Sequence, residues 1–557
     1  MLRLAPAITL VMLLGPIVAG LLGTLGPAFG YLPVLGANTV SLDPWRELLS
    51  HSGFSSALAL TIVSGFGATV ISLALCIALC ATSAGSRGFE RLQRALPPLL
   101  STPHVAIAIG FAFLIAPSGF FARAFSPWAT GWDRPPGFAT VNDVYGLSLI
   151  AGLVLKETAY LALMTIAATG QVAMRASMDA AAALGYSPSR AFIAVVAPRI
   201  YAQIRLPVYA ALAYSLSNVE MALILGPGNP PTLAVLAARW FAGYDLAQYF
   251  PAAAAATLQF AVVLTGVGVW RLMEIPVGAI HRRWVMRGRR RGFMEPALAA
   301  TAGLGKLSVT LAFASIAILA LWSLAFRWRF PDFLPETWSL AIWAQHLGSV
   351  ARLAGVTALI ATVSTLIALT LTLACLENEQ RRAVRVGRGA LWALYIPLLV
   401  PQIAFLFGVQ TLLVRLGFDG SMGAVIWAHL IFVLPYVFLS LADPYRALDP
   451  RFARSAAALG ASPSRIFFTV KLPMLLKSLG VSAAIGFSVS VALYLPTLFT
   501  GAGRVSTLTT EAVTLSSGGD RRVIAVYAFI QAALPLVVYA AALVAPAILY
   551  RNRRGLR

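Results

Sequence analysis

Charged residues are scarce in this sequence, and acidic residues most of all. Of 557 residues, 20 are Asp or Glu and 42 are Lys or Arg, so that only 11% are charged while 59% are hydrophobic. The mean hydropathy of +0.82 lies far above that of soluble globular domains. The composition therefore excludes a soluble protein and indicates a membrane protein.

Cysteine is almost absent as well. The three cysteines, Cys76, Cys80 and Cys375, all fall in apolar stretches and show no C-x-x-C spacing. No disulfide framework can be inferred from them, and small buried apolar side chains are favoured over metal ligands. The five histidines are scattered along the chain, so we predict no metal site.

The sequence also lacks the motifs of an enzyme. The nearest approach to a phosphate-binding loop, G-x-x-x-x-G-K-[ST], lies at 300–307, where Ala300 replaces the first Gly and Leu307 the final Ser or Thr. Neither a Ser-His-Asp arrangement nor paired carboxylates occur on the polar segments. We predict no catalytic residue and no cofactor bound by this chain, which makes a polytopic membrane enzyme the weakest alternative.

Long apolar runs, by contrast, recur along the whole chain. About 20 helical residues cross a hydrocarbon core of ~30 Å. We therefore expect an all-α polytopic membrane protein with about twelve transmembrane helices. The predicted spans are 5–26, 55–82, 97–117, 144–168, 206–226, 248–271, 307–326, 350–376, 391–414, 423–442, 479–500 and 523–549. The first run exceeds the ~7–15 apolar residues of a signal peptide, so we interpret it as a retained span.

A polar decapeptide occurs twice. The stretch AAALGYSPSR at 181–190 returns as AAALGASPSR at 456–465, with one substitution and an offset of 275 residues. The same offset places Gly226 on Gly501 and Asp245 on Asp520 without a gap. We expect two copies of one six-span unit. Because six is even, both copies have the same orientation and are related by an axis along the membrane normal.

The basic residues predict the topology. With the N-terminus in the cytoplasm, most of the 42 Lys and Arg fall in cytoplasmic segments, so the positive-inside rule predicts that both termini are cytoplasmic. The run HRRWVMRGRRRGF begins at His281 and belongs to a predicted cytoplasmic linker, 272–306, between six-span repeats at 1–271 and 307–557. Since topology accounts for the positive charge, we expect the lipid bilayer and no nucleic acid as a partner.

Both copies of the decapeptide lie in predicted cytoplasmic loops, 169–205 and 443–478. In each, an alanine-rich helix runs into a glycine, which leaves a helix at little cost. Ser187-Pro188 and Ser462-Pro463 then predict an N-cap serine and a proline at the first helical position. The second helix should present Phe192 or Phe467 and break near Pro198 or Pro473. We call each arrangement an elbow.

The elbows resemble the signature loop of the permease subunits of binding-protein-dependent ABC importers, in which E-A-A is followed by a glycine and then a proline. Asp179, with Asp in place of Glu, Gly185 and Pro198 match that pattern, whereas Arg454 stands at the acidic position of the second copy. The whole chain, from about residue 50 to 550, resembles the fused two-copy permeases of the thiamine and ferric-iron importers.

The resemblance implies that each elbow docks on a cytoplasmic ATPase. Expected partners are two ABC ATPase subunits, which would hold ATP and Mg²⁺, and an external solute-binding protein. The residues expected to couple to the ATPases are Asp179, Ala180, Ala181, Gly185, Ser187, Pro188, Arg190, Phe192 and Pro198 in the first copy, and Ala456, Gly460, Ser462, Pro463, Arg465, Phe467 and Pro473 in the second. The mismatch at Arg454 predicts that the two docking sites are not equivalent.

Polar residues inside the predicted spans mark a candidate translocation path, because charges there are costly and tend to face the bundle interior. They are Lys156, Glu157, Asn218 and Glu220. Glu220 is a candidate counter-ion for Lys156, and two roles stay open: a structural ion pair, or a polar stripe along the path.

The expected function is that of the permease subunit of an ATP-driven importer in the bacterial inner membrane. It would move a small solute into the cytoplasm, either an organic cation such as thiamine or ferric iron. A twelve-span secondary transporter driven by an ion gradient is the alternative.

Overall fold

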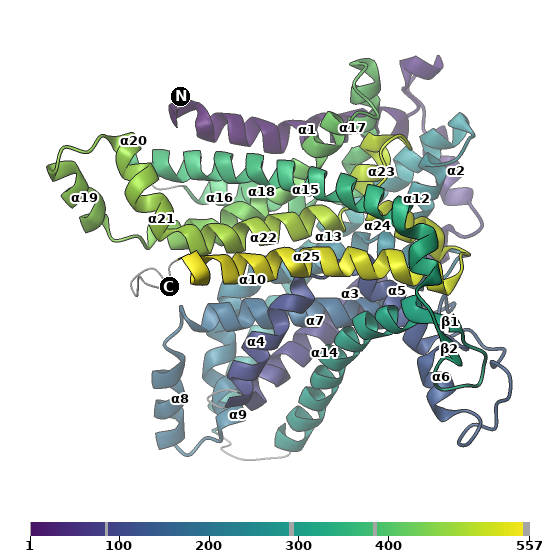
Figure 1. Cartoon of the computed structure of the whole chain (residues 1–557), viewed down its shortest axis with the longest axis horizontal. Coiled ribbons are helices and arrows are strands. Elements are labelled where there is room, and N and C mark those ends of the chain that lie inside the picture. The colour runs from purple at the N-terminus through teal and green to yellow at the C-terminus, as the bar shows by residue number, and fades with distance from the viewer. Residues whose placement is uncertain (1, 84–86, 289–293, 383–386, 550–557) are drawn as a thin grey trace.

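The computed structural model describes residues 2–83, 87–288, 294–382 and 387–549, and nearly all of them form helices (Figure 1). Within these residues, ten helices are long and apolar enough to cross a membrane, or twelve if each of two bent helix pairs counts as one span. The predicted all-α polytopic fold is therefore confirmed.

The first half of the chain runs from α1 to α13. Its helices are α1 (Ala5–Ala28), α2 (Asp43–Ser50), α3 (Phe54–Ser83), α4 (Arg87–Ser101), α5 (His104–Ile115), α6 (Phe120–Phe125), α7 (Leu147–Thr169), α8 (Met174–Ala183), α9 (Pro188–Ala191), the π-helical turn η3 (Phe192–Val196), α10 (Ala197–Ser217), α11 (Glu220–Leu225), α12 (Leu233–Phe241) and α13 (Tyr249–Met286). The last of these continues well beyond residue 271, into the predicted linker.

The second half repeats this order. It comprises α14 (Met294–Leu324), the hairpin β1 (Ala325–Arg327) and β2 (Thr337–Trp338), α15 (Ala341–Arg382), α16 (Arg388–Leu399), α17 (Gln402–Arg415), α18 (Met422–Arg446), α19 (Pro450–Ala458), α20 (Pro463–Ile466), the π-helical turn η5 (Phe467–Lys471), α21 (Leu472–Met474), α22 (Leu476–Ala492), α23 (Leu495–Gly501), α24 (Leu508–Ser516) and α25 (Arg521–Leu549). Residues 289–293, at the end of the basic run, lie outside the described residues.

The two halves share a hydrogen bond between helices as well as their order of helices. The amide of Leu233, at the start of α12, donates to Thr61 Oγ1 at 2.9 Å, and that of Leu508, at the start of α24, donates to Thr357 Oγ1 at 3.0 Å. Leu233 and Leu508 differ by the offset of the decapeptides. The same hydrogen bond between a short helix and a long span therefore occurs in both halves.

Several predicted spans are broken rather than continuous. The predicted span 391–414 consists of α16 and α17, which meet at an angle of 93°. Pro401 lies at this break, where the preceding residue, Val400, is extended (ψ 122°) because a proline disfavours helical backbone before it. Thr102-Pro103 interrupts the predicted span 97–117 in the same way, between α4 and α5. The predicted spans 206–226 and 479–500 end in the short helices α11 and α23.

The first span of each half packs on the other half. Helix α1 lies along α17 and also contacts α15 and α18, while α14 lies along α5 and α3. Glycines allow the close approach of α1 and α17: Gly20 and Gly23 face Gly408, whose amide donates to Thr24 Oγ1 at 3.1 Å. We call this arrangement the exchanged first spans.

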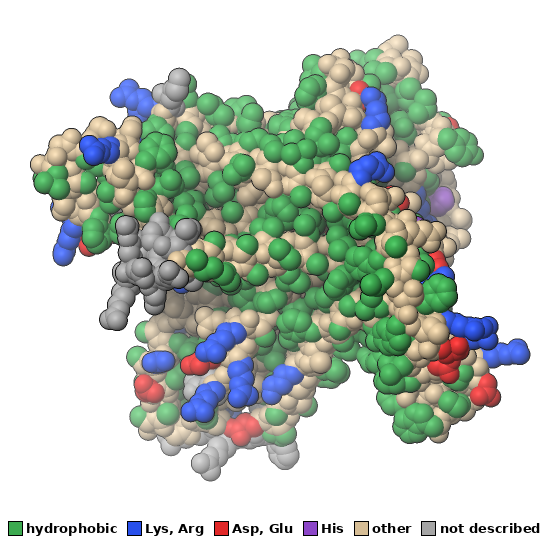
Figure 2. Space-filling model, in the orientation of Figure 1, with side chains coloured by type: hydrophobic (Ala, Val, Ile, Leu, Met, Phe, Trp, Pro, Cys, Tyr) green, Lys and Arg blue, Asp and Glu red, His purple; other side chains and the backbone are tan. Residues whose placement is uncertain are grey.

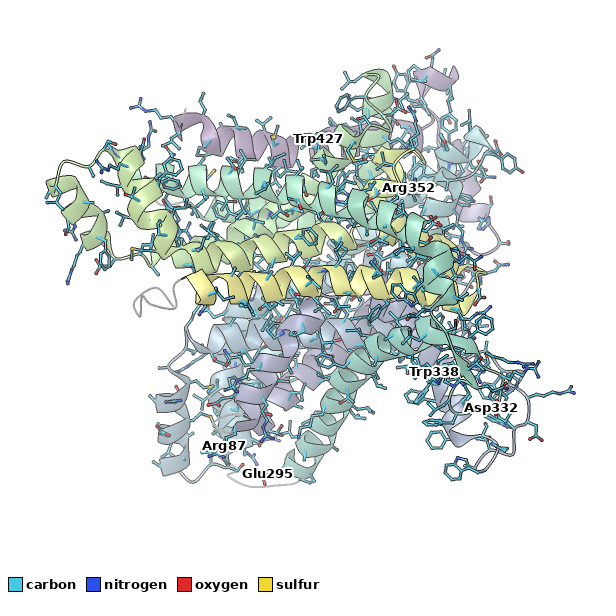
Figure 3. The ribbon with its side chains drawn as sticks, in the orientation of Figure 1. Arg87, Glu295, Asp332, Trp338, Arg352 and Trp427 are labelled. Carbon is cyan, nitrogen blue, oxygen red and sulfur yellow. The ribbon has the colours of Figure 1, made fainter. Side chains whose placement is uncertain are left out.

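The two ends of the bundle differ. Both elbows lie at one end (left in Figure 1), together with the start of α1 and the end of α25, while α6 and the β1–β2 hairpin lie at the opposite end. Figure 2 shows hydrophobic side chains over most of the middle of this face, with lysines and arginines mainly towards the ends. In Figure 3, Arg87 and Glu295 lie at the elbow end and Asp332 at the hairpin end.

Candidate functional site

The first elbow, residues 174–196, turns at a glycine that closes helix α8. Gly185 has a left-handed backbone (φ +81°). Its amide donates to the Ala182 carbonyl at 2.8 Å, and the amide of Tyr186 donates to the Ala181 carbonyl at 3.1 Å. This pair of bonds is a Schellman motif, which satisfies the last carbonyls of a helix and requires a residue that tolerates positive φ.

The second elbow, residues 450–471, has the same turn at the end of α19. Gly460 has φ +79°, and its amide donates to the Ala457 carbonyl at 2.9 Å, while the amide of Ala461 donates to the Ala456 carbonyl at 3.0 Å. The repeated decapeptide therefore encodes one helix–turn–helix geometry twice, at the same end of the bundle (Figure 1).

The helices that follow the turns begin at the expected prolines, Pro188 and Pro463. The predicted serine caps differ, however. Ser462 Oγ accepts a hydrogen bond from the Arg465 amide at 3.3 Å. Ser187 makes no such bond, and its buried Oγ has no partner among the described residues. The predicted cap is thus present in the second elbow and wrong for the first.

The predicted break after each short helix occurs in one elbow only. Pro188 to Ser217 form one continuous helix, so the expected break near Pro198 is wrong. A π-helical turn precedes the proline in both copies, η3 before Pro198 and η5 before Pro473, so this turn does not by itself explain the difference between them. In the second copy the helix bends by 75° after Met474, close to Pro473 as predicted.

Large apolar side chains project from the elbows into solvent. Leu184 is 61% exposed, Leu459 88% and Phe468 63%. Phe192, which we expected on the surface, is instead buried at 1%. Sequence reasoning overlooked the leucines, although each directly precedes the turn glycine.

A buried carboxylate holds the second elbow to the bundle. Glu377, near the end of α15, lies 2.7 Å from Lys471 Nζ and 2.7 Å from Arg381 Nε, and it also accepts a hydrogen bond from the Tyr445 hydroxyl. Arg381 Nη2 donates to the Pro463 carbonyl at 3.3 Å. We call these residues the Glu377 cluster. Since Lys471 ends η5, the cluster joins the second elbow to α15 and α18.

The first elbow is held by other contacts. Arg190 is buried, and its guanidinium lies 4.9 Å from the centre of the Trp284 ring of α13. Arg199 Nη1 donates to Ser177 Oγ at 3.0 Å, across the elbow. The counterpart of Arg190, Arg465, is exposed. Asp179 and Arg454 are exposed too, so the two elbow surfaces carry opposite charges at matching positions.

Lys156 does not pair with Glu220, and the predicted ion pair is wrong. Its ammonium donates to the carbonyls of Leu99 at 2.7 Å and Leu100 at 3.1 Å, and to that of Thr102. These carbonyls lie at the break between α4 and α5, where the last turn of a helix has no intrahelical partners. Lys156 therefore satisfies the backbone of a helix end.

Of the other three path residues, Glu220 contacts a tyrosine that sequence reasoning missed. Glu220 accepts a hydrogen bond from the Tyr214 hydroxyl at 3.1 Å. Asn218 Oδ1 accepts from the amides of Met221 at 2.8 Å and Ala222 at 3.3 Å, and so caps α11. Glu157, Asn218 and Glu220 are all buried in the bundle.

Comparison with known proteins identifies the family. No protein-family model matches the chain. The inner membrane ABC transporter permease protein YnjC of Escherichia coli (strain K12) is 33% identical over 530 residues, which cover 93% of each chain. The putrescine transport system permease protein PotI of the same strain is 29% identical over 119 residues, which are 19% of this chain and 42% of PotI. With its apolar helices and its likeness to YnjC over almost the full length, the chain belongs to the multi-pass ABC transporter permeases of the inner membrane.

Proposed function

We propose that this chain supplies both halves of the membrane channel of an ATP-driven importer, with each elbow docked on one of two cytoplasmic ATPase subunits. The observation that carries the proposal is the pair of identical Schellman turns at one end of the bundle, from which Leu184 and Leu459 project. An exposed apolar side chain on a rigid turn suits insertion into a cleft of a partner. In this proposal both termini are cytoplasmic, and a binding protein delivers the solute to the hairpin end.

The two elbows would transmit ATPase movement by different routes. The first elbow continues without a bend into the helix that ends at Ser217, so its displacement would reach the break at Asn218 directly. The second elbow is separated from α22 by the 75° bend and is tied to α15 through the Glu377 cluster. Movement of the ATPases would therefore reach the two halves of the channel unequally.

The solute in this proposal is small and is either an organic cation, such as thiamine, or ferric iron. PotI, one of the relatives, is named for the transport of putrescine, an organic diamine. That name supports the organic cation among the two choices.

Purification of the tagged permease from its native membrane tests the docking proposal. We expect an ATPase with a phosphate-binding loop to co-purify, as identified by mass spectrometry. Leu459→Arg should reduce its recovery several-fold, because a charged side chain would replace an apolar one that is buried on docking. Trp338→Arg, an exposed apolar residue at the hairpin end, is the matched control and should leave the recovery unchanged. Normal recovery with Leu459→Arg and Leu184→Arg combined would contradict the docking role of the elbows.

A further inference from the structure

One carboxylate between α10 and α13 is shared by two arginines. Glu274 Oε2 lies 2.5 Å from Arg271 Nη1 and 3.2 Å from Arg205 Nε. Its other oxygen, Oε1, accepts hydrogen bonds from the hydroxyls of Tyr201 at 2.7 Å and Tyr209 at 2.9 Å. We call these five residues the Glu274 cluster. Because two guanidinium groups face one carboxylate, the cluster carries one positive charge in excess.

Both guanidinium groups have hydrogen-bond donors to spare. A guanidinium has five N–H donors. Among the described residues, Arg271 donates a single hydrogen bond, to Glu274, and Arg205 contacts the same carboxylate through Nε alone. The side chains of Arg271 and Arg205 are 55% and 38% exposed, while that of Glu274 is 10% exposed. The positive charge therefore reaches the surface, and the negative charge lies beneath it.

The cluster lies near the boundary of the membrane on the elbow side. Helix α13 ends beside the first elbow. Arg271 follows about 22 residues after Tyr249, the first residue of the helix, which is ~33 Å along its axis and close to the ~30 Å thickness of the hydrocarbon core. Trp270 Nε1 donates to the Tyr201 hydroxyl at 3.0 Å. Tryptophan and tyrosine are enriched at this boundary, where polar headgroups begin.

Exposed apolar side chains surround the two arginines. Leu264, two helical turns before Arg271, is 56% exposed, while Leu272 and Ile275 are 65% and 66% exposed. Such a surface suits the acyl chains of lipids rather than water. An anion that reaches the arginines is therefore expected to carry an apolar part, which disfavours a free inorganic ion.

The second half has no such cluster. At the offset of the decapeptides, Gly480 stands in place of Arg205 and Pro546 in place of Arg271. A general excess of basic residues at one side of the membrane would not require this difference between the copies. The charge excess is thus a local property of α10 and α13.

We propose that the Glu274 cluster and the apolar face of α13 around it bind an anionic phospholipid from the leaflet on the elbow side. Arginines suit a phosphate, since their planar donors can bind two of its oxygens at once. The single negative charge of the lipid would neutralise the excess, as in other basic pockets between transmembrane helices. The bound lipid would hold α13 to the helix that continues from the first elbow. This binding needs only the membrane and does not depend on the proposed transport function.

Native mass spectrometry of the purified permease in a non-ionic detergent tests the proposal. Dioleoylphosphatidylglycerol and dioleoylphosphatidylcholine are compared, because they share their acyl chains and differ in net charge. We expect phosphatidylglycerol to be retained several-fold more than phosphatidylcholine. Arg205→Gln combined with Arg271→Gln should remove this difference. Arg282→Gln combined with Arg283→Gln, at two exposed arginines of the same helix, removes the same charge and should preserve it.

Glu274→Gln provides a test that does not remove an arginine. The amide keeps the shape of the side chain but competes less with a phosphate for the guanidinium donors, so the retention of phosphatidylglycerol should rise. Unchanged or lower retention in this variant would overturn the proposal. It is also overturned if both lipids are retained equally by the wild type, if the two double variants lose the difference alike, or if excess inorganic phosphate displaces phosphatidylglycerol, which would indicate a site for a free anion.

Discussion

At the scale of the residue, Lys156 shows how a buried ammonium can serve the backbone rather than a carboxylate. It reaches from α7 to the last carbonyls of α4 and to that of Thr102. A lysine has three donors, and all three are used. The side chain therefore fixes the position of the break between α4 and α5 against α7.

Replacement of Lys156 by methionine should destabilise the protein severely. It would leave three carbonyls without their donor, and each buried unsatisfied group costs about 1–3 kcal/mol. We expect a several-fold loss of monodisperse protein, as measured by fluorescence size-exclusion chromatography after membrane expression. Glu220→Gln added to Lys156→Met should not restore the yield, since the two side chains are not paired. Restoration in the double variant would show that they pair after all.

The sequence could identify Lys156 as buried but could not identify its partner. Its position within an apolar run was sufficient for the first inference. The identity of the partner depends on the helix break at Thr102-Pro103, which lies more than fifty residues earlier. This break exposes backbone carbonyls, which cannot be recognised from a pattern of side chains. Tyr214, which donates to Glu220, was missed for another reason, because aromatic residues in a span look like ordinary membrane-facing side chains.

At the scale of the element, the elbows depend on glycines with positive φ. Gly185→Val and Gly460→Val would place a β-branched residue in the left-handed region, at a cost of about 1–3 kcal/mol. A Cβ at Gly460 would meet no atom within 4 Å, so the strain there comes from the backbone alone. We expect insertion to be retained and ATP hydrolysis to become uncoupled from transport, as measured in proteoliposomes that contain the ATPase.

Alanine variants at the same two glycines provide a graded control, since they carry the unfavourable φ without β-branching. They should be less impaired than the valine variants. We further expect Gly185→Val and Gly460→Val to differ in severity, because different contacts anchor the two elbows. Normal coupled transport by both valine variants would remove the elbows from the coupling mechanism.

The Glu377 cluster provides a test confined to one elbow. Glu377→Gln would leave Lys471 with weaker partners in a site where it is only 8% exposed. Loss of one partner of a buried ion pair costs about 3–5 kcal/mol. We expect faster hydrogen exchange over 450–471 and no change over 174–196, as measured by mass spectrometry. Faster exchange in both elbows would mean that the cluster supports the whole bundle.

Elements whose cause lies in the local sequence were predicted correctly, whereas the others were not. Runs of apolar residues identified the spans, and the repeated Leu-Gly and Ser-Pro pairs identified both turns. The continuation of α9 through η3 into α10 was not predicted, since Pro198 signals a break in an ordinary helix and a π-helical turn has no signature in the sequence. The 75° bend after Met474 differs between the copies although Pro473 corresponds to Pro198, so the proline alone does not decide the outcome.

At the scale of the whole molecule, the exchanged first spans bind the two halves together. The contact of α1 with α17 depends on glycines, because a Cβ at Gly408 would meet the backbone of both Gly20 and Gly23. The corresponding contact of α14 with α5 depends on Gly110, where a Cβ would meet the backbone of Ser315. The sequence repeat could not predict this exchange, because the correspondence between the two copies does not indicate which copy a given span contacts.

Gly408→Val should therefore separate α1 from α17 and destabilise the protein more than an ordinary glycine substitution in a helix. We expect a large fall in unfolding temperature or in the yield of folded protein. Gly268→Val in α13 is the matched control, because a Cβ at Gly268 meets nothing within 4 Å. Equal stability of the two variants would contradict the importance of the close approach between α1 and α17.

The exchanged first spans also have a consequence for how the protein is made. Helix α1 is synthesised first, but the helix along which it lies, Gln402–Arg415, emerges only after most of the chain has been translated. Until then, Gly20 and Gly23 face lipid or an insertion factor rather than their native neighbour. The first half thus remains an open assembly intermediate in the bilayer, and its final packing is delayed until the ribosome has passed the middle of the second half.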